Sequence, residues 1–200
     1  MLKHWSRLIL VLLACGLVVA CGKEKRMADT AIKAAEAAVA SGGEEVAKYA
    51  SDQWKQITDS LASAKESFAK GDYKGALASV QDIGSKVQEA QGAASTKKTE
   101  LENAWNDMSA GVPKMMDAIK SRVDTLSASK KLPAGMDKAK VDGIRSGLSS
   151  ATQTWNEASE AHKAGNLIDA VAKGNSVKEA AAKLMQDLGM SPPAAGGGGA

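Results

Sequence analysis

Residues 101–126 read LENAWNDMSAGVPKMMDAIKSRVDTL, and this stretch decides the fold class. Pro113 lies inside it and predicts a kink near Ala110-Gly111, because proline removes a backbone donor and clashes with the preceding turn. The large apolar residues of the stretch recur at steps of three and four, which places them on one stripe of an α-helix: Leu101, Trp105, Met108, Val112, Met115, Ile119, Val123 and Leu126.

The composition on both sides of this stretch also favours helices. Ala, Lys, Glu, Ser and Gln dominate between Met27 and Met190, and Trp, Tyr and Phe make up 4% of the whole chain. This composition favours helices over strands. We therefore expect an all-α fold, an elongated antiparallel helical bundle or helical-hairpin array of about five helices. A helix of 25 residues would be about 40 Å long.

Glycines and prolines predict the boundaries along the chain. Ser41-Gly42-Gly43 should end a first Ala-rich helix or stalk, and a new helix should begin near Ser95 or Thr96. Gly174-Asn175 weakens the last helix and can split it. The predicted organisation is a signal peptide at 1–20, a lipidated N-terminus and stalk at 21–43, a bundle domain at 44–190 with hairpins 44–92, 95–128 and 136–189, and a disordered Pro/Gly tail at 191–200.

Two predicted corners between helices resemble each other. Gly71-Asp72 and Gly165-Asn166 each place a glycine at the end of one helix and a capping side chain at the start of the next. The offset of 94 residues also superposes Ala64 on Ala158, which suggests two related hairpins. The corner at residues 64–78 resembles that of a tetratricopeptide repeat. No 34-residue repeat accompanies it, so a plain antiparallel hairpin is the favoured interpretation.

The N-terminus resembles the leader of a bacterial lipoprotein. Lys3 and Arg7 precede an apolar run at residues 8–20, whose thirteen residues are too few to span a bilayer as a helix. The residues around Cys21 read Val18-Val19-Ala20-Cys21-Gly22 and resemble a lipobox. This resemblance implies cleavage between Ala20 and Cys21 and acylation of Cys21, with palmitate among the acyl chains.

Two alternatives to this reading of the leader stay open. Cys15 follows Leu12-Leu13-Ala14 and mimics the same motif, but cleavage there would leave a shorter apolar run. The leader can also be an uncleaved anchor, or an ordinary signal peptide without lipid. Gly22, in place of Asp after the cysteine, resembles the signal that sorts lipoproteins to the outer membrane. We therefore expect a lipid-anchored envelope protein on the periplasmic face of the outer membrane.

A wider resemblance supports the same location. The chain is similar to a family of uncharacterised Ala-rich helical bacterial envelope lipoproteins over most of residues 27–90. The matching residues are the Ala-Ile-x-x-Ala-Glu-x-Ala opening at 31–38, Lys48-Tyr49-Ala50, and Gly71-Asp72-Tyr73 followed by Ala76-Leu77. The resemblance implies a helical fold and an envelope location, and it brings no activity or site residue.

Charge and composition argue against several classes of function. Lys and Arg number 26 against 23 Asp and Glu, and the excess falls from +3 to +1 once Lys3 and Arg7 are removed with the leader. Such a weak field, without exposed aromatics beside the basic clusters, gives no reason to expect nucleic acid as a partner. Lys23, Lys25 and Arg26 should lie at the lipid headgroups if Cys21 is acylated.

The titratable residues predict no enzyme. His162 is the one histidine after residue 20, and at a predicted helix end it should interact with free carbonyls. Met108, Met115 and Met116 can be read as a soft-metal site, but their spacing fits a core stripe. We expect no metal, no cofactor beyond the acyl chains on Cys21, no catalytic residue and no small-molecule substrate.

The predicted function is therefore that of a non-enzymatic structural or protein-interaction module, with envelope proteins or the cell wall as its partners. Trp54, Trp105 and Trp155 lie on apolar stripes and should be buried, and an exposed one would be an anchor for a partner. The alternative is a periplasmic lipid or client-protein carrier, in which the kinked third helix and its methionines line a groove.

Overall fold

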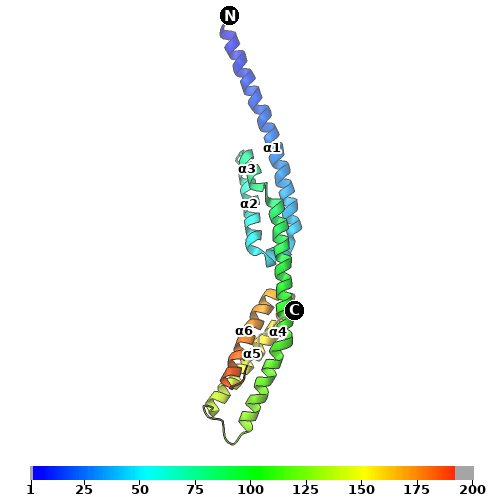
Figure 1. Cartoon of the computed structure of the whole chain (residues 1–200). Helices are drawn as coiled ribbons and strands as arrows, with labels where there is room; N and C mark the ends of the chain where they lie inside the picture. Colours follow the sequence, from blue (N-terminus) through cyan, green and yellow to red (C-terminus); the bar gives the residue numbers. More distant parts are fainter. Residues whose placement is uncertain (1, 192–200) are drawn as a thin grey trace. The chain divides into compact units, whose positions relative to one another are not determined.

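The computed structural model confirms the all-α prediction. It describes the backbone of residues 2–191 and the side chains of residues 22–191, so the tail at 192–200 and the side chains of Cys15, Ala20 and Cys21 lie outside the described residues. Within the described part the chain forms helices and no strand (Figure 1). The helices are α1 Leu2–Tyr49, α2 Ser51–Ala69, α3 Tyr73–Val80, α4 Ile83–Ala128, α5 Lys138–Lys163 and α6 Leu167–Asp187.

The helices form two compact units, residues 1–97 and 98–200, where the sequence predicts one bundle domain over 44–190. Each unit has apolar side chains packed against one another within it, which is why the chain divides. Unit 1 contains α1, α2, α3 and the first part of α4. Unit 2 contains the rest of α4 together with α5 and α6.

The core of unit 1 is built from small and medium side chains. Ile57 of α2 and Ile83 of α4 are each 1% exposed, and Ala64 and Ala76 are fully buried. Gly43, with φ 62°, breaks the helical geometry inside α1, as the two adjacent glycines predict. Gly42 lets the helices approach closely, because a Cβ there would lie 2.6 Å from a ring carbon of Trp54.

Unit 2 has its own core, which α4, α5 and α6 all supply. The buried residues of one cluster within it are Met115, Ile119, Val123, Leu126, Val141, Ile144, Ala181, Met185 and Leu188. The predicted weakness at Gly174 does not split α6, which runs unbroken from Leu167 to Asp187. Gly174 is needed for packing, because a Cβ there would lie 3.0 Å from the sulfur of Met108 and 3.7 Å from the ring of Trp155.

The predicted start of a helix near Ser95 is wrong. The chain turns at Gln81-Asp82, and α4 then begins at Ile83 and continues past Ser95. Val87, Ala90, Ala94 and Leu101 are buried at helical spacing, so apolar burial carries the helix through Gly92. The helix also continues through Pro113.

The two corners 94 residues apart have the same hydrogen bonds. Gly71 (φ 82°) and Gly165 (φ 75°) adopt the left-handed conformation that ends a helix. Their amides donate to the carbonyls of Phe68 and His162, both at distances near 3 Å (3.0 and 2.9 Å). The amides of the next residues donate to the carbonyls of residues 67 and 161, and the Asp72 and Asn166 side chains accept from the amides of residues 75 and 169.

The alanines beside the two corners also correspond. Ala64 and Ala158 are both fully buried, as are Ala76 and Ala170. The suggested relation between the two hairpins therefore extends to their geometry.

Candidate functional site

The segment that follows Cys21 is the first candidate, because it adjoins the predicted lipid. Gly22 to Arg26 belong to α1, and the Arg26 Nε donates to the carbonyl of Gly22 at 3.4 Å. The Nζ of Lys74, in the first turn of α3, lies 3.8 Å from the Glu24 Oε1. The corner between α2 and α3 therefore lies beside the segment of α1 that follows Cys21. Among the residues with described side chains, no helix is both long and apolar enough to cross a membrane.

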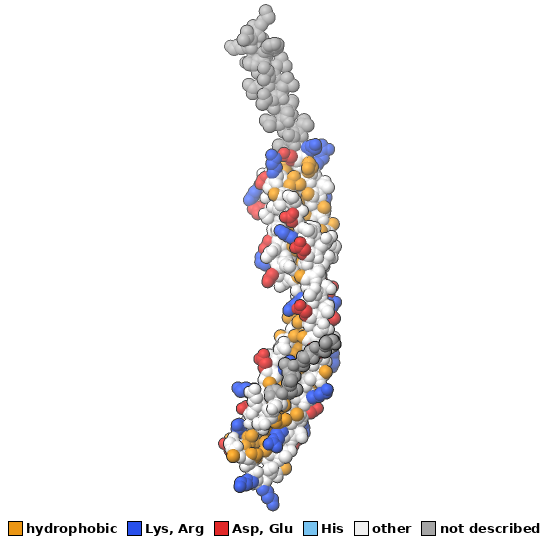
Figure 2. All heavy atoms as spheres, viewed as in Figure 1, with side chains coloured by type: hydrophobic (Ala, Val, Ile, Leu, Met, Phe, Trp, Pro, Cys, Tyr) orange, Lys and Arg blue, Asp and Glu red, His pale blue; other side chains and the backbone are white. Residues whose placement is uncertain are grey.

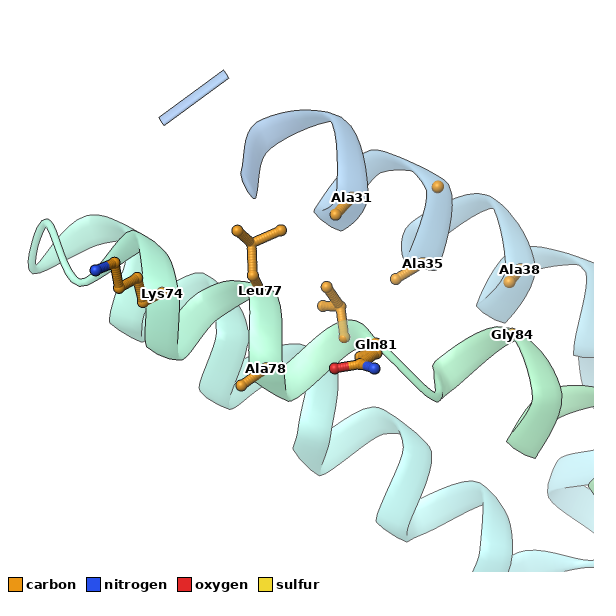
Figure 3. Close-up of a pocket in the computed structure, with 10 residues that line it drawn as sticks. Ala31, Ala35, Ala38, Lys74, Leu77, Ala78, Gln81 and Gly84 are labelled. Atoms are coloured by element: carbon orange, nitrogen blue, oxygen red, sulfur yellow. The ribbon is translucent and has the colours of Figure 1, made fainter. Parts of the chain in front are cut away.

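The second candidate is an open groove in unit 1 of about 660 Å³ between α1 and α3 (Figure 3). Alanines of α1 form one wall, and Leu77 of α3 extends toward them in the close-up. Lys74 lies toward one end of the groove, whereas Gln81 and Gly84 lie toward the other. The lining residues are Ala31, Ala34, Ala35, Ala38, Lys74, Leu77, Ala78, Val80, Gln81 and Gly84.

The groove exists because the facing side chains are short. An alanine side chain ends at Cβ, so the α1 wall leaves space that a larger apolar residue would fill. The lining is largely apolar, with a single charged group, Lys74. Such a surface can accept an apolar chain or the side chains of another helix, and it has no set of polar groups that would fix a polar substrate.

The third candidate is an aromatic stack in unit 2. The ring of Trp105 lies 5.3 Å from that of Trp155 at an interplanar angle of 9°, and 4.6 Å from that of His162 at 11°. Trp155 and His162 are seven residues apart on α5, about 10.5 Å along the helix axis. The two separations together nearly match this rise, so Trp105 inserts between the two rings.

This stack corrects the expectation for His162. Its position near the end of α5 predicts an interaction with free carbonyls, but the imidazole stacks on Trp105 instead. His162 lies two turns after Trp155 on α5, so its imidazole reaches the face of the Trp105 ring that Trp155 does not cover. There it can stack on the indole. The stack fixes the register of α4 against α5, so we assign it a structural role.

None of the three candidate tryptophan anchors is exposed. Trp105 is 6% exposed, and Trp54 and Trp155 are half-buried. Trp54 packs against Gly42 in unit 1, and Trp155 lies beside Trp105 and Gly174 in unit 2. A tryptophan would have to be exposed to anchor a partner, and none of these three residues is.

The methionines do not line the groove. Met108, Met115 and Met116 are buried in unit 2, with Met108 against Gly174, whereas the groove lies in unit 1. Among residues 22–191, no group of three or more His, Cys, Asp or Glu side chains is placed to hold a metal ion. The expected core role of the methionines is confirmed by their burial.

The charged side chains mostly pair along single helices. A hydrogen bond from Lys70 holds the pKa of Glu66 below its ordinary value, and a hydrogen bond to Asp29 holds the pKa of Lys33 above its own. Raised lysine pKa values have the same cause at Lys55, Lys120 and Lys173. The Glu66 pairing is lost only as pH falls through the lowered pKa, and the lysine pairings are lost only as pH rises through the raised ones. These exposed pairs support helices and remain intact at neutral pH.

Sequence reasoning missed the groove. The Ala-rich composition of residues 31–38 predicts part of a stalk or a short first helix and does not specify what packs against it. The signal available was the run of alanines at Ala31, Ala34, Ala35 and Ala38, whose spacing of three and four residues puts them along one side of a helix.

Comparisons of the chain with protein-family models, curated proteins and solved structures found no match.

Proposed function

We propose that this chain is a lipid-anchored protein of the bacterial cell envelope, held on the periplasmic face of the outer membrane through acyl chains on Cys21. Its helical body is a non-enzymatic structural or protein-interaction module. The observation that carries the proposal is the sequence Val18-Val19-Ala20-Cys21-Gly22 after a short basic and apolar leader. Several acyl chains, each methylene contributing about 0.8 kcal/mol on burial, make such an anchor permanent on the timescale of cellular processes.

The helical body is better suited to binding a partner than to catalysis. Its two units are small helical bundles with apolar interiors, and their charged side chains lie on the surface. The open groove of unit 1 offers an apolar surface to a partner. The envelope proteins and the cell wall are the partners that an anchored module of this kind would meet.

Chemical cross-linking in cells followed by purification tests the interaction part. We expect the full chain to recover an envelope protein or a cell-wall fragment that a form truncated after residue 43 does not recover. The truncated form keeps Cys21 and the leader, so both forms are compared at the same membrane. Identical recoveries from the two forms would count against an interaction role for the body.

A second candidate function, a carrier of lipid or of a client protein, is favoured by the groove. In this version an acyl chain lies along the alanine wall between α1 and α3. Native mass spectrometry of the purified protein should then show a co-purifying lipid. Ala34→Trp, which puts a large ring on the groove wall, should remove that lipid, whereas Ala37→Trp, at an exposed position outside the lining, should retain it. Lipid that is retained in both variants would exclude the groove as the carrier site.

A further inference from the structure

The stretch of α1 that follows Cys21, which cleavage after Ala20 would make the N-terminal end of the helix, carries positive charge that the rest of unit 1 does not neutralise. Lys23, Lys25 and Arg26 are exposed, and none of them forms an ion pair with another residue of the range 22–191. We call these three residues the basic collar. Figure 2 shows Lys and Arg side chains gathered where the described part of α1 begins.

The acidic residues near the collar are already paired. Glu24 lies 3.8 Å from the Nζ of Lys74, and Asp29 pairs with Lys33 at 2.7 Å. The pair between Glu24 and Lys74 therefore leaves the collar with three positive charges. A surface with this charge fits a partner that is densely negative, and anionic lipid headgroups are the negative surface nearest to an acylated Cys21.

The geometry of the collar indicates how the helix meets that surface. Successive helical residues are about 100° apart, so Lys23, Lys25 and Arg26 lie within an arc of about 160°, on the side of α1 away from its buried residues. A helix that lies flat in the interface needs a separate apolar face to insert. The apolar face of α1 is occupied, because Ala28, Ile32 and Ala35 are buried in the core of unit 1. Further along this side, Asp29 and Glu36 pair with Lys33 and Lys65, so the unpaired positive charge is confined to the residues next to Cys21. Once cleavage removes residues 1–20, this charge lies at the end of α1 and favours end-on contact.

Met27 adds an apolar contact at the same level. It is 53% exposed and is one of two large apolar residues exposed in the described part of the chain, the other being Ile168 in unit 2. An exposed apolar side chain beside basic residues is typical of segments that reach the headgroup layer.

We propose that the basic collar and Met27 form a membrane-docking surface for anionic phospholipid, which holds α1 end-on at the headgroups. This inference rests on the proposed lipid anchor, and it adds the lipid class and the orientation. Because each basic residue near an anionic surface contributes about 1 kcal/mol, losing one charge should weaken the docked state about five-fold. Losing all three should weaken it on the order of 100-fold.

The experiment uses the acylated protein reconstituted in vesicles of phosphatidylglycerol and phosphatidylethanolamine that contain a headgroup-attached quencher. Fluorescent labels are placed on Met27→Cys or on Ser41→Cys, fourteen residues further along α1 and about 21 Å away in a helix. With Cys21 acylated, the label is confined to the introduced thiol. We expect strong quenching at position 27 and weak quenching at position 41, with the signal at position 27 falling in vesicles of phosphatidylcholine alone.

The charge contribution is tested with two matched triple variants. Lys23→Gln, Lys25→Gln and Arg26→Gln together should lower quenching at position 27, whereas Lys130→Gln, Lys131→Gln and Lys138→Gln, all exposed in unit 2, should leave it unchanged. Equal quenching at positions 27 and 41 in the acylated protein, or equal effects of the two triple variants, would overturn the collar and leave the anchor intact. An intact mass without acyl groups would refute the anchor. The collar is then tested by itself in a chain of residues 22–200 with Met27→Cys, which has no other thiol, and strong quenching at position 27 would sustain it.

Discussion

Trp105→Ala is expected to lower the free energy of unfolding of unit 2 by about 3 to 5 kcal/mol. The residue is 6% exposed, and its ring stacks on Trp155 and on His162, so truncation leaves a cavity and removes two ring contacts. Denaturant unfolding measures the loss. Amide hydrogen exchange should place it in residues 98–191, with little change in unit 1.

A matched variant separates the volume of the side chain from ring stacking. Trp105→Phe keeps an aromatic ring between Trp155 and His162, so its cost should be clearly smaller than that of Trp105→Ala. A loss below roughly 1 kcal/mol for Trp105→Ala would contradict the burial of this ring and its role in fixing α4 against α5.

The helix corners could be predicted from sequence because their cause is local. Gly71 and Gly165 are the residues that adopt positive φ most readily, and Asp72 and Asn166 cap the helices that follow. The same applies to Gly43, where the helical geometry of α1 breaks. In each case the residue type and its immediate neighbours are sufficient to predict where the helix ends.

The errors fall where packing overrides local preference. Gly174 looks like a weak point in a helix, but it is buried, and its lack of a side chain leaves room for Met108 and Trp155. No glycine or proline marks the turn at Gln81-Asp82, so sequence patterns gave no reason to place it there. Helix propensity alone predicts such positions weakly, and at Gly174 the contacts with other helices outweigh it.

The candidate sites were less predictable than the helices. The groove depends on which residues of α3 face the alanines of α1, and the stack depends on Trp105 entering between two rings of α5. Both arrangements are set by how helices pack, which a single sequence does not specify. Cys21 differs, because its proposed role follows from a short contiguous motif that is read before folding.

Cys21→Ser is expected to abolish acylation completely. The thiol of Cys21 is the group to which the proposed lipid is attached, and a serine hydroxyl cannot replace it as a thiolate nucleophile. Metabolic labelling with a clickable fatty acid should mark the wild-type chain and leave the Cys21→Ser chain unlabelled. Cys15→Ser serves as the control, because residue 15 lies in the leader that cleavage removes, and it should be labelled like the wild type.

The most direct test of the lipid anchor is the intact mass of the protein purified from the membrane fraction. The mature chain should begin at Cys21 and carry the added mass of its acyl groups. A chain that retains residues 1–20, begins at another residue, or begins at Cys21 without added mass would contradict the account.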